Sequence, residues 1–160
     1  MNLEINIETR ININEVHELA KFIEETQLVS DSIIRKYDNI KSAIIEFDNY
    51  ESLFIKAYLA EELVGIMFGC NSIFILSDKS LEYFPCFYIS DLAVKISHRN
   101  MGIAKAMINQ LESIVKDRDY KSITADTKFN GRSYNLLKSI RYKDTKSYSA
   151  IGFHRLIKIL

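Results

Sequence analysis

A short stretch near the middle of the chain, SHRNMGIAKA (Ser97 to Ala106), places an arginine and a glycine just ahead of an amphipathic helix. The unpaired backbone N–H groups at the start of a helix, together with its positive dipole end, make a natural site for an anion. Gly102 would let a ligand approach the main chain, and Arg99 would add charge where a phosphate lies. The alternative is that Gly102 only relieves a tight connection between a strand and the helix.

Two familiar nucleotide-binding loops do not fit this stretch. The dinucleotide fingerprint needs three spaced glycines, and the P-loop needs a Gly-Lys-Ser/Thr sequence. The stretch has the pattern R-x-x-G-x-A and contains neither of these arrangements. An anion at this loop would therefore be held in some other way.

The elements around this loop alternate between strand and helix. The sequence predicts a strand from Cys86 to Val94, a helix from about Gly102 to Lys116 with apolar residues along one side, and a strand from Lys121 to Thr127. Two strands connected through a helix in this way are expected to be parallel, with a right-handed crossover.

Antiparallel strands are predicted at both ends of this unit. The expected elements before it are a strand over 3–9, a helix from a cap at Asn14 to about residue 26, one or two helices from Asp31 to Phe47, a hairpin of strands 52–60 and 63–76 across Glu61 and Glu62, and a loop containing Pro85. A helix over 131–140 and strands over 141–149 and 152–160 follow it. The expected fold class is mixed α/β, and residues 1–160 are expected to form a single domain.

Composition excludes several classes of partner. The chain has 21 Lys and Arg against 21 Asp and Glu, so no overall charge favours nucleic acid or an anionic membrane. Its first residues are charged, and no apolar run approaches the roughly 20 residues that span a bilayer, so we expect a cytoplasmic protein without a membrane segment. Cys70 and Cys86 form no CxxC pair, and the histidines show no metal spacing. We therefore expect buried, reduced thiols and no metal site.

The segment DLAVKISHRNMGIAKAMINQL resembles the acetyl-coenzyme A binding segment of the GNAT superfamily of N-acetyltransferases, in which a strand ending in Leu-x-Val leads through R/Q-x-x-G-x-G/A into a helix. The segment NGRSYNLLKSIRYK, from Asn130 to Lys143, resembles the second cofactor element of the family. The resemblance covers about the last half of the chain. The chain departs from the family pattern at Leu137, where many members have tyrosine, at Arg141, which replaces glycine, and at Tyr142, which replaces phenylalanine.

The resemblance implies an acetyl-coenzyme A site along these two segments, in a central, mostly antiparallel sheet flanked by helices. Backbone amides from Asn100 to Lys105 would hold the pyrophosphate, and the main chain of Leu92 to Val94 would pair with the pantetheine arm like an added strand. The two parallel strands would splay apart, with the thioester between them. The expected cofactor-binding residues are Leu92, Ala93, Val94, Arg99, Asn100, Met101, Gly102, Ile103, Ala104, Lys105, Asn130 and Ser133.

The reaction implied is direct attack of an amine on the thioester in a ternary complex. An alkylammonium group has a pKa of about 10.4, so it must lose a proton before it attacks. Asp91 and Ser90 are the candidates to position or deprotonate the amine, although Asp91 could instead brace a loop. A main-chain N–H of Leu92 or Val94 is the candidate oxyanion donor.

Tyr134 is the candidate general acid for the departing thiolate. It lies one turn after Asn130 and one turn before Leu137, so the three are expected to share a stripe of one helix. Its ring could equally belong to the core, and the sequence offers no evident partner to orient its hydroxyl. Because a thiol of this kind has a pKa of about 8.5, water alone could protonate the thiolate.

The sequence therefore predicts an N-acetyltransferase that moves an acetyl group from acetyl-coenzyme A to a primary amine of a small molecule, such as a polyamine, aminoglycoside or amino acid. One alternative is transfer to a protein N-terminus or lysine, and another is a module of the same fold that binds coenzyme A or a partner protein without catalysis. Acidic residues of the first half suggest a cationic acceptor, although solvated helix ends explain them equally well: Glu24, Glu25, Glu46, Asp48 and Glu51. A homodimer is compatible with the resemblance, because family members often dimerise.

Overall fold

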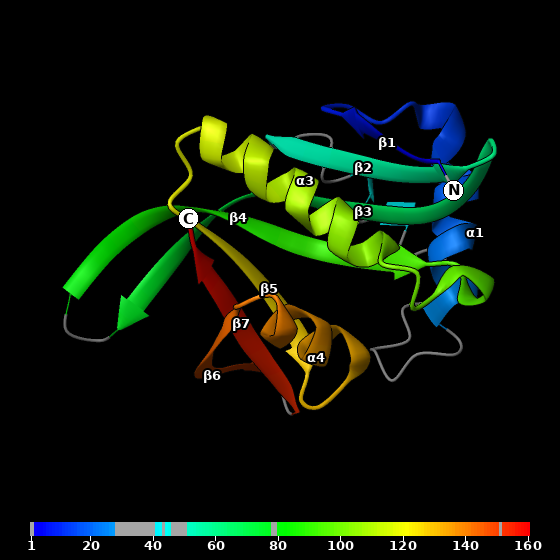
Figure 1. Ribbon diagram of the computed structural model, residues 1–160. Helices are drawn as coiled ribbons and strands as arrows, with labels where there is room; N and C mark the ends of the chain where they lie inside the picture. The colour runs from blue at the N-terminus through cyan, green and yellow to red at the C-terminus, as the bar shows by residue number, and fades with distance from the viewer. Residues whose placement is uncertain (1, 28–40, 43, 46–50, 78–79, 151) are drawn as a thin grey trace.

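The computed structural model describes residues 2–27, 41–42, 44–45, 51–77, 80–150 and 152–160. The strands of these residues form one seven-stranded sheet in the order β1-β2-β3-β4-β5-β7-β6 (Figure 1). The strands are β1 (Leu3–Glu8), β2 (Ser52–Leu59), β3 (Glu62–Ser77), β4 (Ser80–Val94), β5 (Ser122–Lys128), β6 (Lys143–Ala150) and β7 (Phe153–Ile159). The helices are α1 (Val16–Gln27), α3 (Ile103–Asp117) and α4 (Arg132–Ser139), with short 3-10 turns η1 (Ile13–Glu15) and η2 (Ile96–His98).

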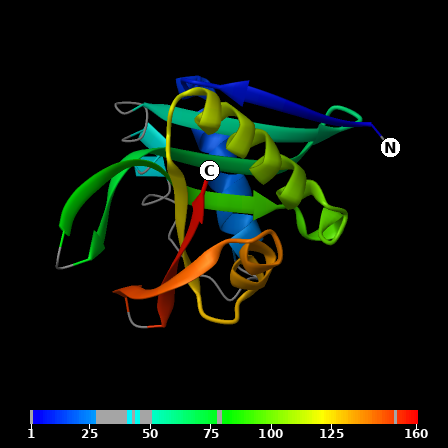
Figure 2. The same cartoon turned by 60° about the vertical axis from the view of Figure 1, so that its left-hand side comes forward.

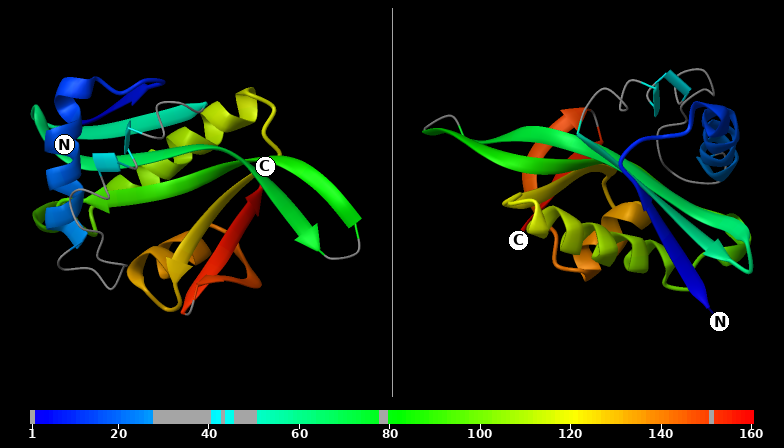
Figure 3. Two further views of the ribbon diagram at one scale, coloured as in Figure 1. Left: turned by 180° about the vertical axis from the view of Figure 1, so that it is seen from behind. Right: turned by 90° about the horizontal axis from the view of Figure 1, so that it is seen from above.

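Helices α1 and α3 cover opposite faces of the sheet (Figure 3). Alternate residues of each strand point to opposite faces, so Leu53 and Ile55 of β2 pack on the α3 side while Phe54 packs on the α1 side. Apolar stripes of the two helices complete two hydrophobic cores, one on each face. Leu137 of α4 joins the core on the α3 side. The fold is therefore mixed α/β with a mostly antiparallel sheet, as predicted.

The two parallel strands β4 and β5 are paired over only part of their length. Pairing joins Cys86–Ile89 to Ser122–Ala125, yet β4 continues to Val94 and β5 continues to Lys128. Beyond the last pair, Ile89 with Ala125, the two strands diverge towards their carboxyl ends (Figure 2). The splayed parallel pair that the family resemblance implies is present.

A β-bulge marks the point of divergence on β4. Ile89 lies opposite Gly69 of β3 and Asp91 lies opposite Phe68, so Ser90 is the extra residue of the bulge. Glycine is required at position 69, because a Cβ atom there would lie 2.1 Å from the backbone oxygen of Tyr88. The bulge places Ser90 and Asp91 where β4 leaves β5.

Two local predictions are wrong. Asn12, not Asn14, caps the first helical turn, and its side chain accepts a hydrogen bond of 3.1 Å from the backbone N–H of Asn14. Pro85 lies inside β4, opposite Ile73, and not in a loop. The backbone oxygen of Pro85 accepts a hydrogen bond from the backbone N–H of Lys121, so this residue turns its polar backbone groups towards β5. The missing N–H of the proline faces the same side. The pairing of β4 with β5 begins only at Cys86, so no hydrogen bond between these strands is lost.

The other predicted elements agree with the structure to within a few residues, apart from the much earlier start of β4. The βαβ unit is β4, α3 and β5, and its strands are parallel. The helix or helices expected from Asp31 to Phe47 fall mostly outside the described residues. Within that range, residues 41–42 and 44–45 are described and are helical, and Ile44 is buried in the core on the α1 side. Cys86 is buried as expected, whereas Cys70 is only half-buried.

Candidate functional site

A cavity of about 650 Å³ opens where β4 and β5 diverge. Most of its lining comes from four places: the end of β4, the loop leading into α3 with the start of that helix, the end of β5, and α4. Thr26 of α1 and Phe153 of β7 complete the lining. Ligands of α/β sheets collect at such carboxyl ends of strands, and a cavity of this size accommodates a small organic ligand. The divergence of the two strands therefore creates the candidate site.

The loop between η2 and α3 forms one end of the cavity. Gly102 caps α3 with a φ of +82°, and a Cβ atom added there would meet no atom within 4 Å. The first hydrogen bond of the helix runs from the N–H of Ala106 to the oxygen of Gly102 over 2.9 Å. The N–H groups of residues 103–105 precede that bond and have no partner within the helix. This arrangement suits a phosphate held against the main chain.

Basic side chains surround this end of the cavity. Lys105, Lys128 and Arg132 line it, and Arg99 joins them from the loop. Burial and the positive charge of Arg132 lower the pKa of the Arg99 guanidinium. A bound anion would favour the charged guanidinium and so offset both effects, and the charges at this end therefore favour an anionic ligand.

Arg99 has a second role that its sequence position did not reveal. Its Nε donates to the backbone oxygen of Val94 over 3.1 Å, and Nη2 donates to that of Thr26 over 2.8 Å. Among the described residues, its buried Nη1 has no hydrogen-bond partner. The guanidinium thus braces the loop against the last turn of α1 and the end of β4.

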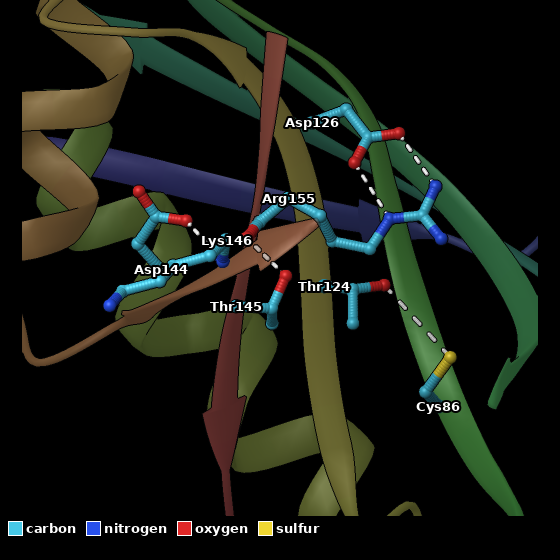
Figure 4. Close-up of polar contacts among 7 residues, drawn as sticks. All are labelled: Cys86, Thr124, Asp126, Asp144, Thr145, Lys146 and Arg155. Carbon is cyan, nitrogen blue, oxygen red and sulfur yellow. Dashed lines mark hydrogen bonds and ion pairs between the residues drawn. The ribbon is translucent and has the colours of Figure 1, made fainter. Parts of the chain in front are cut away.

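Two carboxylates line the other end of the cavity, close to the point where the strands diverge: Asp91 and Asp126 follow shortly after the last pair of Ile89 with Ala125. Asp91 of β4 accepts a hydrogen bond of 2.9 Å from the Ser90 hydroxyl. Asp126 of β5 is held by Arg155 of β7 through two hydrogen bonds of 2.8 Å, one to each carboxylate oxygen (Figure 4). These bonds hold the pKa of Arg155 above its ordinary value. Since Arg155 takes both oxygens of Asp126, that carboxylate is poorly placed to accept a proton.

Most of the residues predicted for the site line this cavity. They are Ser90, Asp91, Leu92, Ala93, Val94, Arg99, Asn100, Gly102, Ile103, Ala104, Lys105 and Ser133. Met101, Asn130 and Tyr134 are not among its lining residues. Met101 is 47% exposed, and Asn130 precedes α4 with a φ of +57°. The predicted roles of these three residues have no support from the cavity geometry.

Tyr134 points away from the cavity, towards β6 and β7. Its hydroxyl donates a hydrogen bond of 3.0 Å to Oδ2 of Asp144. The sequence offered no evident partner for this hydroxyl, because no local pattern reveals a bond between a helix and a strand ten residues further on. Leu137, at the position of the family tyrosine, is buried and lines the cavity with apolar surface.

Several cavity residues were not predicted from the sequence. Thr26 lies in the last turn of α1, Asp126 and Lys128 lie in the last residues of β5, and Arg132 begins α4. The position of Asp126 and Lys128 at the carboxyl end of a strand was a usable signal. Thr26 carried none, since it comes to the cavity through tertiary packing.

The cavity fits coenzyme A by its own geometry. The open space at Gly102, the helix N–H groups and the cations suit the phosphates, and the end of β4 offers main chain that no longer pairs with β5. In the part of the chain that the structure describes, no cluster of three His, Cys, Asp or Glu could hold a metal. No helix within that part is long and apolar enough to cross a membrane.

The fold and the site together define an acetyltransferase of the GNAT class. Residues 14–140 match the model of the acetyltransferase (GNAT) family. The chain belongs to this family, as predicted, and it is an acetyl-coenzyme A-dependent N-acetyltransferase. No curated protein sequence matches it.

Solved structures with the same fold include three N-acetyltransferases. PaiA N-acetyltransferase from Thermoplasma acidophilum, in complex with coenzyme A, is 15% identical with a TM-score of 0.72 over 100% of both chains. Aminoglycoside 6'-acetyltransferase type Ii is 19% identical with a TM-score of 0.70, over 98% of this chain and 96% of its own. Ribosomal-protein-alanine N-acetyltransferase from Brucella melitensis biovar Abortus 2308 is 17% identical with a TM-score of 0.68, over 93% and 97%. At these identities the likeness establishes the fold.

Proposed function

We propose that this enzyme transfers the acetyl group of acetyl-coenzyme A directly to a primary amine of a small molecule, with both substrates bound together. The observation that carries the proposal is that one cavity between β4 and β5 has helix N–H groups and cations at one end and, close to the divergence of the strands, the Asp91 carboxylate at the other. The first end suits a diphosphate, and the second suits an amine. One cavity can therefore hold donor and acceptor against each other.

The cofactor end of the cavity would hold the donor through main chain and charge. The N–H groups from Asn100 to Lys105 would receive the diphosphate, with Lys128 and Arg132 adding charge. The main chain of Leu92 to Val94 would pair with the pantetheine arm, because β4 no longer pairs with β5 there. These contacts would fix the thioester at the divergence of the two strands.

Asp91 would accept the proton that the ammonium must lose, and Ser90 would orient its carboxylate. Bound acetyl-coenzyme A supplies the thioester whose acetyl carbon the amine nitrogen attacks, breaking the C–S bond. A backbone N–H of Leu92 or Val94 would donate to the developing oxyanion. Leu137 offers no acid for the thiolate, and a thiol with a pKa of about 8.5 can take its proton from water.

The acceptor is less closely defined than the donor. The structural neighbours include enzymes whose names give an aminoglycoside and a ribosomal protein as acceptors. Two of the acidic residues of the first half form ion pairs. Oε1 of Glu25 lies 4.0 Å from Nζ of Lys21, and Oε1 of Glu51 lies 3.5 Å from Nη1 of Arg118. These contacts support a structural role for the two glutamates. Glu46 and Asp48 lie outside the described residues. The proposal of a small cationic acceptor thus rests on Asp91 itself.

A panel of acceptors tests the proposal. Release of free thiol from acetyl-coenzyme A would be followed with polyamines, aminoglycosides, amino acids, and peptides with a free N-terminus or lysine. Turnover with a small amine supports the proposal, whereas turnover only with peptides favours a protein acetyltransferase. Binding of coenzyme A without turnover on any amine would favour a binding module. The cytoplasmic location and the homodimer stay predictions.

A further inference from the structure

Helix α4 forms one wall of the cavity but has few buried side chains of its own. It carries Arg132, Ser133, Asn135 and Leu136 into the cavity lining, and among its residues only Leu137 is fully buried. A helix of 8 residues is too short to be stable in isolation. Its position, and so the position of this wall, must be set by contacts with the rest of the fold.

A polar cluster on the far side of α4 supplies such contacts. Oδ2 of Asp144 on β6 accepts the hydrogen bond of the Tyr134 hydroxyl and lies 2.6 Å from Nδ1 of His154 on β7. The other oxygen, Oδ1, accepts a hydrogen bond of 2.7 Å from the backbone N–H of Lys146 (Figure 4). One carboxylate therefore joins α4 to two strands.

The backbone of β6 aims this carboxylate. The pairing of β6 with β7 shifts register between Asp144 and Tyr148, and Lys146 has a φ of +58°. This irregularity turns the N–H of Lys146 back towards Oδ1 of Asp144, as in an Asx turn. The direction of the Asp144 side chain is thus fixed by its own strand, independently of α4.

Asp144 is an ionised acceptor in this cluster. Burial opposes its ionisation, but the Lys146 N–H, His154 and Tyr134 outweigh burial and lower the pKa of Asp144. An ionised carboxylate only accepts, so both Tyr134 and His154 must donate, and Nδ1 of His154 carries a proton. Charge-assisted bonds of this kind are stronger than neutral ones.

Aromatic packing completes the cluster from the loop that precedes α4. The Phe129 ring stacks on His154 with a centroid distance of 4.6 Å and meets the Tyr134 ring edge-on at 5.2 Å. The rings of Tyr134 and His154 also meet edge-on, at 6.0 Å. The cluster of Phe129, Tyr134, Asp144 and His154 therefore fixes both the start and the first turn of α4.

We propose that Asp144 is a positioning residue for the donor substrate: through Tyr134 and His154 it holds α4 so that Arg132 and Ser133 face the phosphates of coenzyme A. The inference rests on the proposed function of the cavity. Asp144 and Tyr134 touch neither substrate. Their loss should weaken donor binding and leave the chemical step nearly unchanged.

The test compares three variants by steady-state kinetics and by calorimetry with coenzyme A. Tyr134→Phe removes only the hydroxyl, Asp144→Asn removes the charge, and the double variant removes both. Each single variant should raise the KM for acetyl-coenzyme A and the Kd for coenzyme A about 3- to 10-fold, the size of one lost hydrogen bond, with kcat within about 2-fold. Because the two residues act through one bond, the double variant should be little worse than Asp144→Asn.

Thr145→Val is the matched control on the same strand. Thr145 donates a hydrogen bond of 3.0 Å to the backbone oxygen of Arg155 on β7 (Figure 4). Its loss should lower stability without changing donor binding. Hydrogen exchange should rise over residues 132–139 in Tyr134→Phe but not in Thr145→Val.

Three outcomes decide the matter. Unchanged KM and Kd in folded Tyr134→Phe and Asp144→Asn would overturn the positioning role. A fall in kcat of Tyr134→Phe at constant KM would also overturn it, because Tyr134 would then be the general acid. A parent enzyme that does not bind coenzyme A would instead overturn the proposed use of the cavity, so the two failures are distinguishable.

Discussion

The guanidinium of Arg99 donates a hydrogen bond of 2.8 Å to the backbone oxygen of Thr26, in the last turn of α1. A second bond, of 3.1 Å, runs from the same side chain to the backbone oxygen of Val94. One arginine thus connects the first helix of the chain to the end of β4. This side chain therefore fixes the last turn of α1, which brings Thr26 to the cavity, against a loop 73 residues further along the chain.

Replacing Arg99 should therefore cost stability as well as donor affinity. Arg99→Met keeps much of the apolar stem but removes both bonds, and we expect a loss of about 2–4 kcal/mol in the free energy of unfolding. Arg99→Lys keeps the charge but lacks the planar guanidinium that makes both bonds, so it should lose nearly as much stability. Urea unfolding followed by circular dichroism measures both variants. Equal stability of Arg99→Lys and the parent would show that charge, and not the two bonds, is what matters at this position.

Acid should loosen the attachment of α4. The pKa of Asp144 is lowered in the folded protein. Its contribution to stability is therefore fully present above the ordinary aspartate pKa of about 3.9 and is lost as the pH falls through the lower folded value. Asp144→Asn should show a smaller loss of stability between about pH 5 and pH 2 than the parent. Urea unfolding across this range measures the difference, with the exposed Asp119→Asn as a control that should behave like the parent. Parallel curves for parent and Asp144→Asn would contradict the prediction.

The loop at Gly102 should not tolerate a side chain that is both large and negative. Gly102→Glu places bulk and charge in the open space where a diphosphate must touch the main chain, so coenzyme A binding should be largely abolished. Gly152→Glu is the matched control, because Gly152 also has a positive φ, +80°, with nothing within 4 Å of an added Cβ. Both changes carry a backbone strain of about 1–3 kcal/mol, so only their effects on binding should differ. Unchanged affinity in calorimetry of folded Gly102→Glu would mean that the donor binds elsewhere.

The sequence predicted those parts of the site that are contiguous in the chain. The turn at Gly102 and the helix after it form a local motif, and the alternating and 3.6-residue patterns located the strands and helices that carry it. The strand containing Asp91 was predicted for the same reason. Its bulge was not, because it depends on the close approach of Gly69 to the backbone of Tyr88 in another strand.

The remaining site residues depend on contacts that no local pattern encodes. Thr26 and Arg132 reach the cavity only because α1 and α4 pack where they do. The bond between Tyr134 and Asp144 depends on the irregular backbone near Lys146, for which the sequence offers no glycine or proline as a signal. Long-range geometry of this kind is a property of the folded state and not of any window of residues.

Asp91 is the residue on which the chemical step is expected to depend. Asp91→Asn keeps the shape of the side chain but removes its ability to take a proton at neutral pH. We expect kcat to fall by roughly 10²–10⁴-fold, with little change in the KM for acetyl-coenzyme A, if Asp91 is the general base. Ser90→Ala, which removes only the 2.9 Å bond to Asp91, should lower kcat far less.

The pH dependence separates the role of a base from that of a brace. An alkylammonium acceptor has a pKa of about 10.4. Below that pH, each increase of one pH unit raises the fraction of neutral amine about tenfold. The defect of Asp91→Asn should therefore shrink between about pH 7 and pH 9.5, because the acceptor then arrives already deprotonated. If Asp91 only braces the loop, the Asp91→Asn variant should instead lose stability and activity by the same factor at every pH in this range. Steady-state turnover of parent, Asp91→Asn and Ser90→Ala across the range, with circular dichroism at each pH to confirm folding, decides between the two. A constant ratio of parent to Asp91→Asn would return Asp91 to a structural role.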